Sequence, residues 1–99
     1  MHLKKGCKLF VRVDFKTGEN EMTGQDVENH LVYVKNIAKE RYFLGGGFSN
    51  IDGGMCLFEA QNIEEAQKVA QNDPIIEKGF YRSEIYEWNL AVLSEDCTP

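Results

Sequence analysis

Two side chains that could exchange protons with a substrate stand far apart in this sequence. His30 lies in an apolar stripe with Val27 and Leu31, and the spacing of this stripe predicts a helix. Asp73 precedes Pro74 at the end of a second, shorter amphipathic segment. Burying an ionisable group in an apolar layer is costly unless the group is paired. If both helices pack on one sheet, we therefore expect His30 and Asp73 to meet.

A histidine paired with an aspartate has two interpretations. In a catalytic dyad, the carboxylate fixes the imidazole tautomer, and the other ring nitrogen meets a substrate proton. In a structural pair, the same contact only ties the first helix to the loop after the second. Sequence pattern does not decide between them. One ring nitrogen reachable from solvent would favour the enzyme, and two nitrogens bonded to protein would favour the scaffold.

Hydrophobic periodicity and capping signals predict four strands and two helices. Thr23 and Asp26 resemble a capping box that opens the first helix, and Asn62 caps the second, which Pro74 stops. The strands are expected over residues 7–15, 42–44, 55–60 and about 81–92. The order is βαββαβ.

This order predicts a ferredoxin-like α+β fold with a four-stranded antiparallel sheet and both helices on one of its faces. We treat residues 1–99 as a single domain with its core at about 7–92. Whichever alternate residues of the strands face the helices, apolar side chains remain on the opposite face. A half-apolar open face indicates a partner. We therefore expect two copies to pack sheet to sheet as a homodimer, a dimeric α+β barrel.

The chain direction in this fold gathers several segments at one end of the sheet. Phe15 at the exit of the first strand, Gly46 and Gly47 after the second, and the His30–Asp73 pair all fall there, so we predict a small-molecule pocket lined by these residues. The glycine run lacks the spacing of a phosphate-binding loop. It is either a strand end with unusual backbone angles or a place where backbone approaches a ligand closely.

Other features of the chain limit the function classes. Arg12 and Asp14 in the first strand form an ion pair on the dimer face, lie at solvated edges, or, with least support, clamp a substrate. Eleven basic against sixteen acidic residues give a formal charge of −5, which works against nucleic acid and anionic membrane surfaces as partners. The third predicted strand also lacks the basic and aromatic pattern of RNA-binding sheets.

Cysteine and histidine spacing gives no support to a metal site, and no cofactor is implied. We interpret Cys7, Cys56 and Cys97 as free thiols in a reducing compartment. No stretch has the length of a signal peptide or a membrane span, so a cytoplasmic location is expected.

Several short motifs, in this order and spacing, resemble the YCII-related (YciI-like) domain family over about Leu9 to Trp88. They are His30-Leu-Val-Tyr-Val-Lys, Phe43-Leu-Gly-Gly-Gly, Gly53-Gly54, Ile63-Glu-Glu-Ala-Gln and Asp73-Pro-Ile-Ile-Glu-Lys-Gly79. The resemblance implies a dimeric α+β barrel whose pocket holds a histidine–aspartate pair, here His30 and Asp73, proposed as an active site. Lyase-type or isomerase-type chemistry on small organic molecules is the implied activity.

This sequence departs from the family pattern at two places. Val27 stands where the family often has an arginine, which puts anion binding there in doubt, and Gly46-Gly47 replaces a common glycine–proline pair. Our favoured hypothesis is a small enzyme that uses His30 and Asp73, without a cofactor, for proton transfer or elimination on a small organic molecule. The alternative is a non-catalytic dimeric module that binds a small ligand or a protein.

Overall fold

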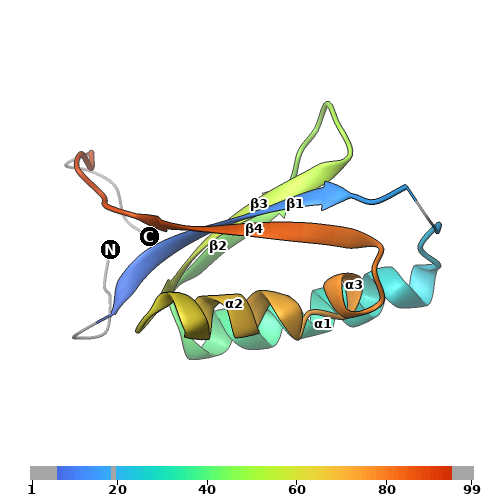
Figure 1. Cartoon of the computed structure of the whole chain (residues 1–99), viewed down its shortest axis with the longest axis horizontal. Coiled ribbons are helices and arrows are strands. Elements are labelled where there is room, and N and C mark those ends of the chain that lie inside the picture. The colour runs from blue at the N-terminus through green and yellow to red at the C-terminus, as the bar shows by residue number, and fades with distance from the viewer. Residues whose placement is uncertain (1–6, 19, 95–99) are drawn as a thin grey trace.

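A computed structural model describes residues 7–18 and 20–94 of the chain. Its elements are β1 (Lys8–Lys16), α1 (Gly24–Glu40), β2 (Phe43–Gly47), β3 (Gly53–Ala60), α2 (Ile63–Gln71), α3 (Pro74–Glu77) and β4 (Tyr81–Trp88). The strands form one antiparallel sheet in the order β2-β3-β1-β4. The three helices of the described chain all lie on one face of it (Figure 1). The predicted α+β fold with a four-stranded antiparallel sheet is confirmed.

The hydrophobic core lies between the centre of the sheet and α2. Phe10 and Phe58 are paired in the β1–β3 register, and their ring centroids are 6.4 Å apart. Ala66 and Val69 of α2 pack against this pair. Because residues alternate between the faces of a strand, the position of Phe10 also sends Arg12 and Asp14 toward the helices.

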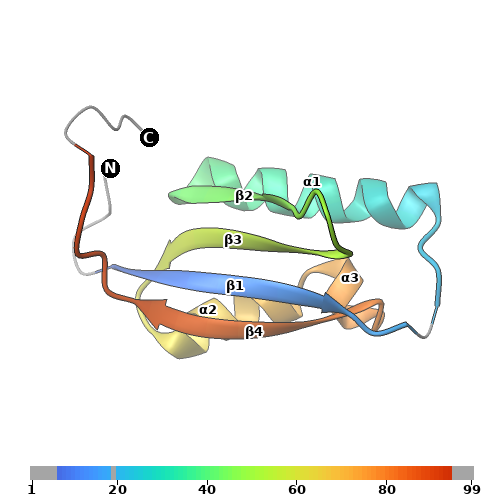
Figure 2. The same cartoon turned by 90° about the horizontal axis from the view of Figure 1, so that it is seen from above.

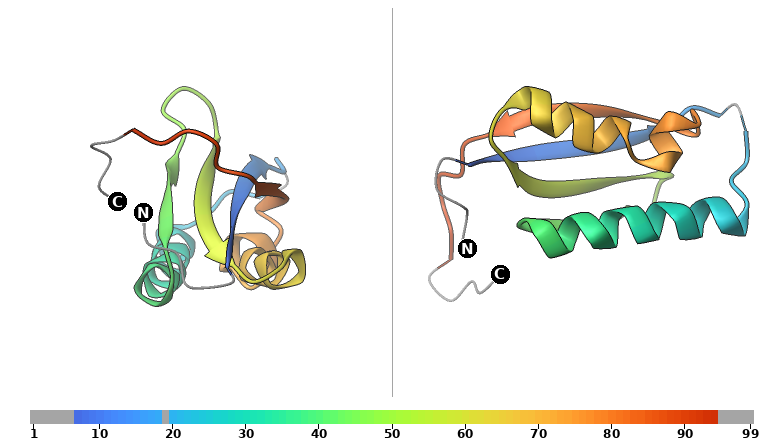
Figure 3. Two further views of the ribbon diagram at one scale, coloured as in Figure 1. Left: turned by 90° about the vertical axis from the view of Figure 1, so that its left-hand side faces the viewer. Right: turned by 90° about the horizontal axis from the view of Figure 1, so that it is seen from below.

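Helix α1 begins at the predicted capping box. The hydroxyl of Thr23 accepts a hydrogen bond from the Asp26 backbone N–H at 3.1 Å, and the Asp26 carboxylate accepts one from the Thr23 backbone N–H at 2.8 Å. The helix runs beneath β2, whereas α2 runs beneath β1 and β4 (Figures 2 and 3). None of its 17 residues, all of which are described, is fully buried. The side chains that face the sheet are half-buried.

The structure corrects the extent of several predicted elements. Strand β2 continues through the glycine run to Gly47, because the backbone of Gly45 to Gly47 pairs with β3 although glycine has little strand propensity. Strand β4 ends at Trp88 and does not reach residue 92. An unpredicted third helix, α3, begins directly after Asp73, whose carboxylate caps it, with Pro74 in its first turn.

The face of the sheet opposite the helices is rich in apolar side chains. One row across it joins Leu44, Leu57, Val11 and Tyr86. Trp88 lies on the same face, and its side chain, like those of Leu44 and Tyr86, is exposed. In the described part of the chain, no helix combines the length and apolar character that a membrane crossing requires.

Candidate active site

A pocket of about 280 Å³ opens between α1 and the end of the sheet formed by β2 and β3. Apart from Cys56, the positions of β2 and β3 that face the helices at this end are glycines, namely Gly45, Gly47 and Gly54. They place no side chains in the layer between sheet and helix. The hollow is therefore a consequence of missing side chains, and its floor is largely backbone.

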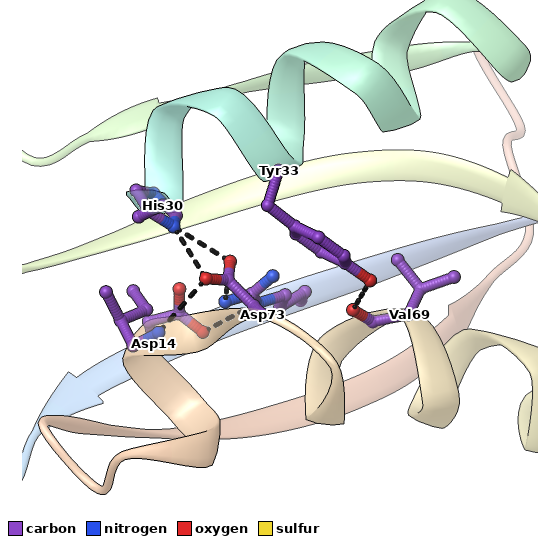
Figure 4. A network of polar contacts seen from close by, with 7 residues as sticks. Asp14, His30, Tyr33, Val69 and Asp73 are labelled. Carbon is purple, nitrogen blue, oxygen red and sulfur yellow. Dashed lines mark hydrogen bonds and ion pairs between the residues drawn. The ribbon is translucent and has the colours of Figure 1, made fainter. Parts of the chain in front are cut away.

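His30 enters this pocket from α1. Its Nδ1 lies 2.9 Å from Oδ1 and 2.8 Å from Oδ2 of Asp73 (Figure 4). Among the described residues, no hydrogen-bond partner is found for its Nε2, and the side chain is 25 % exposed. One ring nitrogen is thus held by protein while the other can meet a molecule in the pocket.

Asp73 is fully buried between α2 and α3. Besides His30, it accepts hydrogen bonds from Nη2 of Arg12 at 3.0 Å and from the backbone N–H of Ile75 at 3.2 Å. An ionised carboxylate is an acceptor with two oxygens, and here both oxygens meet donors. Asp73 therefore joins α1, α3 and β1 at one point.

Arg12 supplies the positive charge of this network. It is 2 % exposed, and its Nε donates to Oδ1 of Asp14 at 2.8 Å while its Nη2 donates to Asp73. Burial by itself disfavours the charged guanidinium, but the hydrogen bond and negative charge of Asp14, together with the charge of Asp73, raise the pKa of Arg12. The guanidinium thus stays charged in the interior.

Tyr33 fixes the distance between the two long helices. One turn after His30, its hydroxyl donates to the backbone carbonyl of Val69 in α2 at 2.7 Å (Figure 4). Partial burial and the charge of Asp73 raise the pKa of Tyr33, so the hydroxyl keeps its proton for this bond. Helix α1 is held to α2 here although it buries no residue completely.

The structure brings most of the predicted site residues together. His30 contacts Asp73, and Gly46 and Gly47 line the pocket. Phe15 is not among the lining residues. It follows Asp14 on β1 and points to the opposite face, where the guanidinium of Arg82 lies 4.4 Å from its ring centroid.

Sequence reasoning gave Arg12 and Asp14 no central role, yet both line the pocket. The available signal was their alternation with Phe10, since charged residues in phase with a core residue on a central strand must be paired.

Cys56 also lines the pocket, and burial raises the pKa of its thiol to about 12, so it is not a nucleophile at neutral pH. Cys7 and Cys56 are free thiols, while Cys97 lies outside the described residues. Within residues 7–18 and 20–94, no group of three or more potential ligands is placed to hold a metal ion.

Comparison with known proteins finds similarity in both sequence and structure. The family model of the YCII-related domain matches residues 9–89. The uncharacterized protein YjpA of Bacillus subtilis (strain 168) is 31 % identical over 67 residues, which are 67 % of this chain and 79 % of YjpA.

Among solved structures, the chain is similar to 5-chloro-2-hydroxyhydroquinone dehydrochlorinase (TftG) from Burkholderia phenoliruptrix AC1100, in complex with 2,5-dihydroxybenzoquinone. The TM-score is 0.69 at 18 % identity, and the match covers 84 % of this chain and 95 % of the other. At this identity the likeness concerns the fold.

Proposed function

The chain belongs to the YCII-related domain family, and from this premise we propose that it is a small enzyme that uses His30 and Asp73 for proton transfer or elimination on a small organic molecule. The observation that carries the proposal is the unequal environment of the two imidazole nitrogens. Nδ1 is hydrogen-bonded to a buried carboxylate, whereas Nε2 has no partner among the described residues, and the side chain lines the pocket. A purely structural histidine would have both nitrogens bonded to protein.

The contacts of His30 support a base at Nε2. An ionised Asp73 accepts a hydrogen bond from Nδ1–H, and this leaves the lone pair on Nε2 free to take a substrate proton. With a neutral imidazole, the formal charge of Arg12, Asp14 and Asp73 together is −1, and a proton on His30 brings the network to zero. The network can therefore compensate the charge that His30 acquires when it acts as a base.

An elimination at this site proceeds in one balanced step. Nε2 of His30 takes the substrate proton, the electron pair of the broken bond forms a new π bond, and the leaving group departs with its own bonding pair. The pocket volume lies near the lower end of small-molecule sites, about 300–1,000 Å³, which favours a single-ring substrate. The dehydrochlorinase of like fold acts on such a ring, so chlorinated hydroxyhydroquinones are the first substrates to test.

Chloride release from these compounds tests the proposal. We expect turnover by the wild-type protein and a loss of about 10²- to 10⁴-fold in His30→Gln, the range that general acid–base catalysis contributes. Asp73→Asn should also lose activity while the protein remains folded. Asn36→Gln, at an exposed position on the same helix, is the matched control and should retain activity. Turnover that survives in His30→Gln would exclude the dyad.

The alternative, a non-catalytic binding module, predicts a different pattern. His30 and Asp73 would then matter for folding alone. In that case His30→Gln would lower the free energy of unfolding by about 3 kcal/mol or more, as breaking a buried pair does. Asp73→Asn also leaves Arg12 with one carboxylate fewer, so its stability does not separate the two functions. No substrate of the panel would be turned over.

We also propose a homodimer that forms through the open sheet face. Its support is the exposed apolar set Leu44, Tyr86 and Trp88 on a face that no helix of the described chain covers. Sedimentation at micromolar concentration should show a dimer, and Trp88→Glu should dissociate it or unfold the protein by placing an unpaired charge in the interface. A monomeric wild-type protein would contradict the proposal.

The free thiols of Cys7 and Cys56 support a cytoplasmic location.

A further inference from the structure

Asp14 brings a second carboxylate to the pocket. Its side chain is 13 % exposed and lines the cavity. Oδ1 accepts the hydrogen bond from Nε of Arg12 at 2.8 Å, and in the described part of the chain Oδ2 has no hydrogen-bond partner. Oδ2 is not completely enclosed by protein atoms, so a ligand in the pocket that Asp14 lines could contact it.

The neighbours of Asp14 in the sheet leave it open to a ligand. Across β3 and β2, the row that contains Asp14 continues through Gly54 and Gly47, neither of which has a side chain to cover the carboxylate. His30 comes from α1, on the other wall of the pocket (Figure 4). A ring placed over the glycine floor therefore has Asp14 at its edge and is within the cavity that His30 faces.

The charges of the site define which ligands fit. The guanidinium of Arg12 is shared by two carboxylates, those of Asp14 and Asp73, so it offers no unmatched positive charge to an anion. An ionised Asp14 can only accept hydrogen bonds. An anionic ligand would be repelled at this edge, and a hydroxyl group would be bound.

We propose that Asp14 accepts a hydrogen bond from a ligand hydroxyl and thereby makes the pocket selective for neutral hydroxylated rings, such as phenols and hydroquinones, over carboxylates. Asp14 is in this view a specificity-determining residue. The inference rests on the proposed function only in placing the ligand in the pocket of His30, and it concerns binding, not proton transfer.

Two probes, hydroquinone and benzoate, test the inference by NMR titration of the labelled protein. The wild-type protein should bind hydroquinone at least about tenfold more tightly than benzoate, since a site built to bind a hydroxyl strongly rejects ligands without one. In Asp14→Asn, the amide oxygen can keep the Arg12 contact while the amide N–H₂ turns to the pocket. A donor then replaces an acceptor, and we expect the hydroquinone-to-benzoate affinity ratio to fall about tenfold or more.

Glu28→Gln is the control for the lost charge, because Glu28 is exposed on α1 and does not line the pocket. Its affinity ratio should equal that of the wild type. If Asp14→Asn does not fold, wild-type crystals soaked in hydroquinone decide the matter, since a hydroxyl oxygen should lie about 3 Å from Oδ2 of Asp14.

Three results would overturn the inference. They are failure of hydroquinone to bind at millimolar concentration, equal wild-type affinity for benzoate, and an affinity ratio unchanged in folded Asp14→Asn. If the protein binds hydroquinone through Asp14 but releases no chloride from any chlorinated analogue, this inference stands and the proposed catalysis is contradicted.

Discussion

Replacing Arg12 by methionine should destabilise the protein far more than its place on a strand would suggest. Methionine retains the apolar stem of the side chain and removes only the charged head. The change leaves Asp73, fully buried, and Asp14, 13 % exposed, without their shared cation. Removing one partner of a buried ion pair costs about 3–5 kcal/mol. The total stability of a domain is about 5–15 kcal/mol, so the loss is a large fraction of it.

Urea unfolding followed by circular dichroism measures this loss, because urea is uncharged and does not screen the ion pairs. Thermal denaturation should show a decrease in Tm of at least about 12 °C, at roughly 4–8 °C per kcal/mol for a domain of this size. All variants are compared at one protomer concentration, since formation of the proposed dimer would couple stability to concentration.

Lys8→Met is the matched control. Lys8 is 58 % exposed on the same strand and pairs with Glu87, and an exposed ion pair contributes about 0–1 kcal/mol. The double variant Arg12→Met/Asp73→Asn should be less destabilised than the sum of its single changes, because it removes one of the stranded carboxylates. A loss below about 1 kcal/mol in Arg12→Met, or strict additivity in the double variant, would refute the role of Arg12 as the shared counter-ion.

Three further predictions concern other parts of the fold. The backbone and side-chain hydrogen bonds of Thr23 lower the pKa of Asp26, so its stabilising contribution is present above the ordinary value of about 3.9 and is lost as the pH falls through the lowered one. Asp26→Asn should therefore lower Tm at pH 7. In melting curves recorded over a series of pH values, the difference in Tm between the variant and the wild type should disappear below about pH 4. A Tm difference that stays constant with pH would contradict this prediction. Burial raises the pKa of Cys56 to about 12, and mass spectrometry after iodoacetamide treatment at pH 8 should find Cys56 unmodified in the folded protein and alkylated in urea. A methyl group on Gly45 would lie 2.7 Å from Cβ of Cys56, whereas one on Gly46 meets nothing within 4 Å, so Gly45→Ala should cost about 1–3 kcal/mol in urea unfolding and Gly46→Ala should be tolerated.

Local signals in the sequence were sufficient for most of the fold. The alternation in β1, and the caps at Thr23 and Asn62, are contacts between residues close in the chain, and they predict their elements directly. The glycine strand could not be predicted in this way, because Gly45 to Gly47 are held in β2 by backbone pairing with a distant segment. Helix α3 had a usable signal, an aspartate followed by proline, which is typical of a helix start as well as a helix stop.

The site could be predicted only in part, because some of its contacts also depend on packing between segments that are distant in the chain. His30 and Asp73 were expected to meet because topology alone brings α1 and the end of α2 to one end of the sheet. The face of β1 that meets the helices was left open, since both sets of alternate residues contain apolar members. Only the packing of Phe10 against Phe58 decides it. Because Phe10 faces the helices, Arg12 and Asp14 face them as well and line the pocket, whereas Phe15 faces the opposite side of the sheet.

Helix α1 buries none of its residues completely, and this affects how the site forms. The core of β1, β3 and α2 holds most of the buried apolar residues and α1 holds none of them, so α1 should open at a lower free energy than the whole domain, and its amides should exchange hydrogen sooner. His30 moves with this helix, and the contact with Asp73 breaks whenever it opens. A molecule bound between His30 and the glycine floor stabilises the closed state alone. Docking of α1 and filling of the pocket are therefore one coupled equilibrium, in which the ligand completes the packing that the glycines leave unfinished.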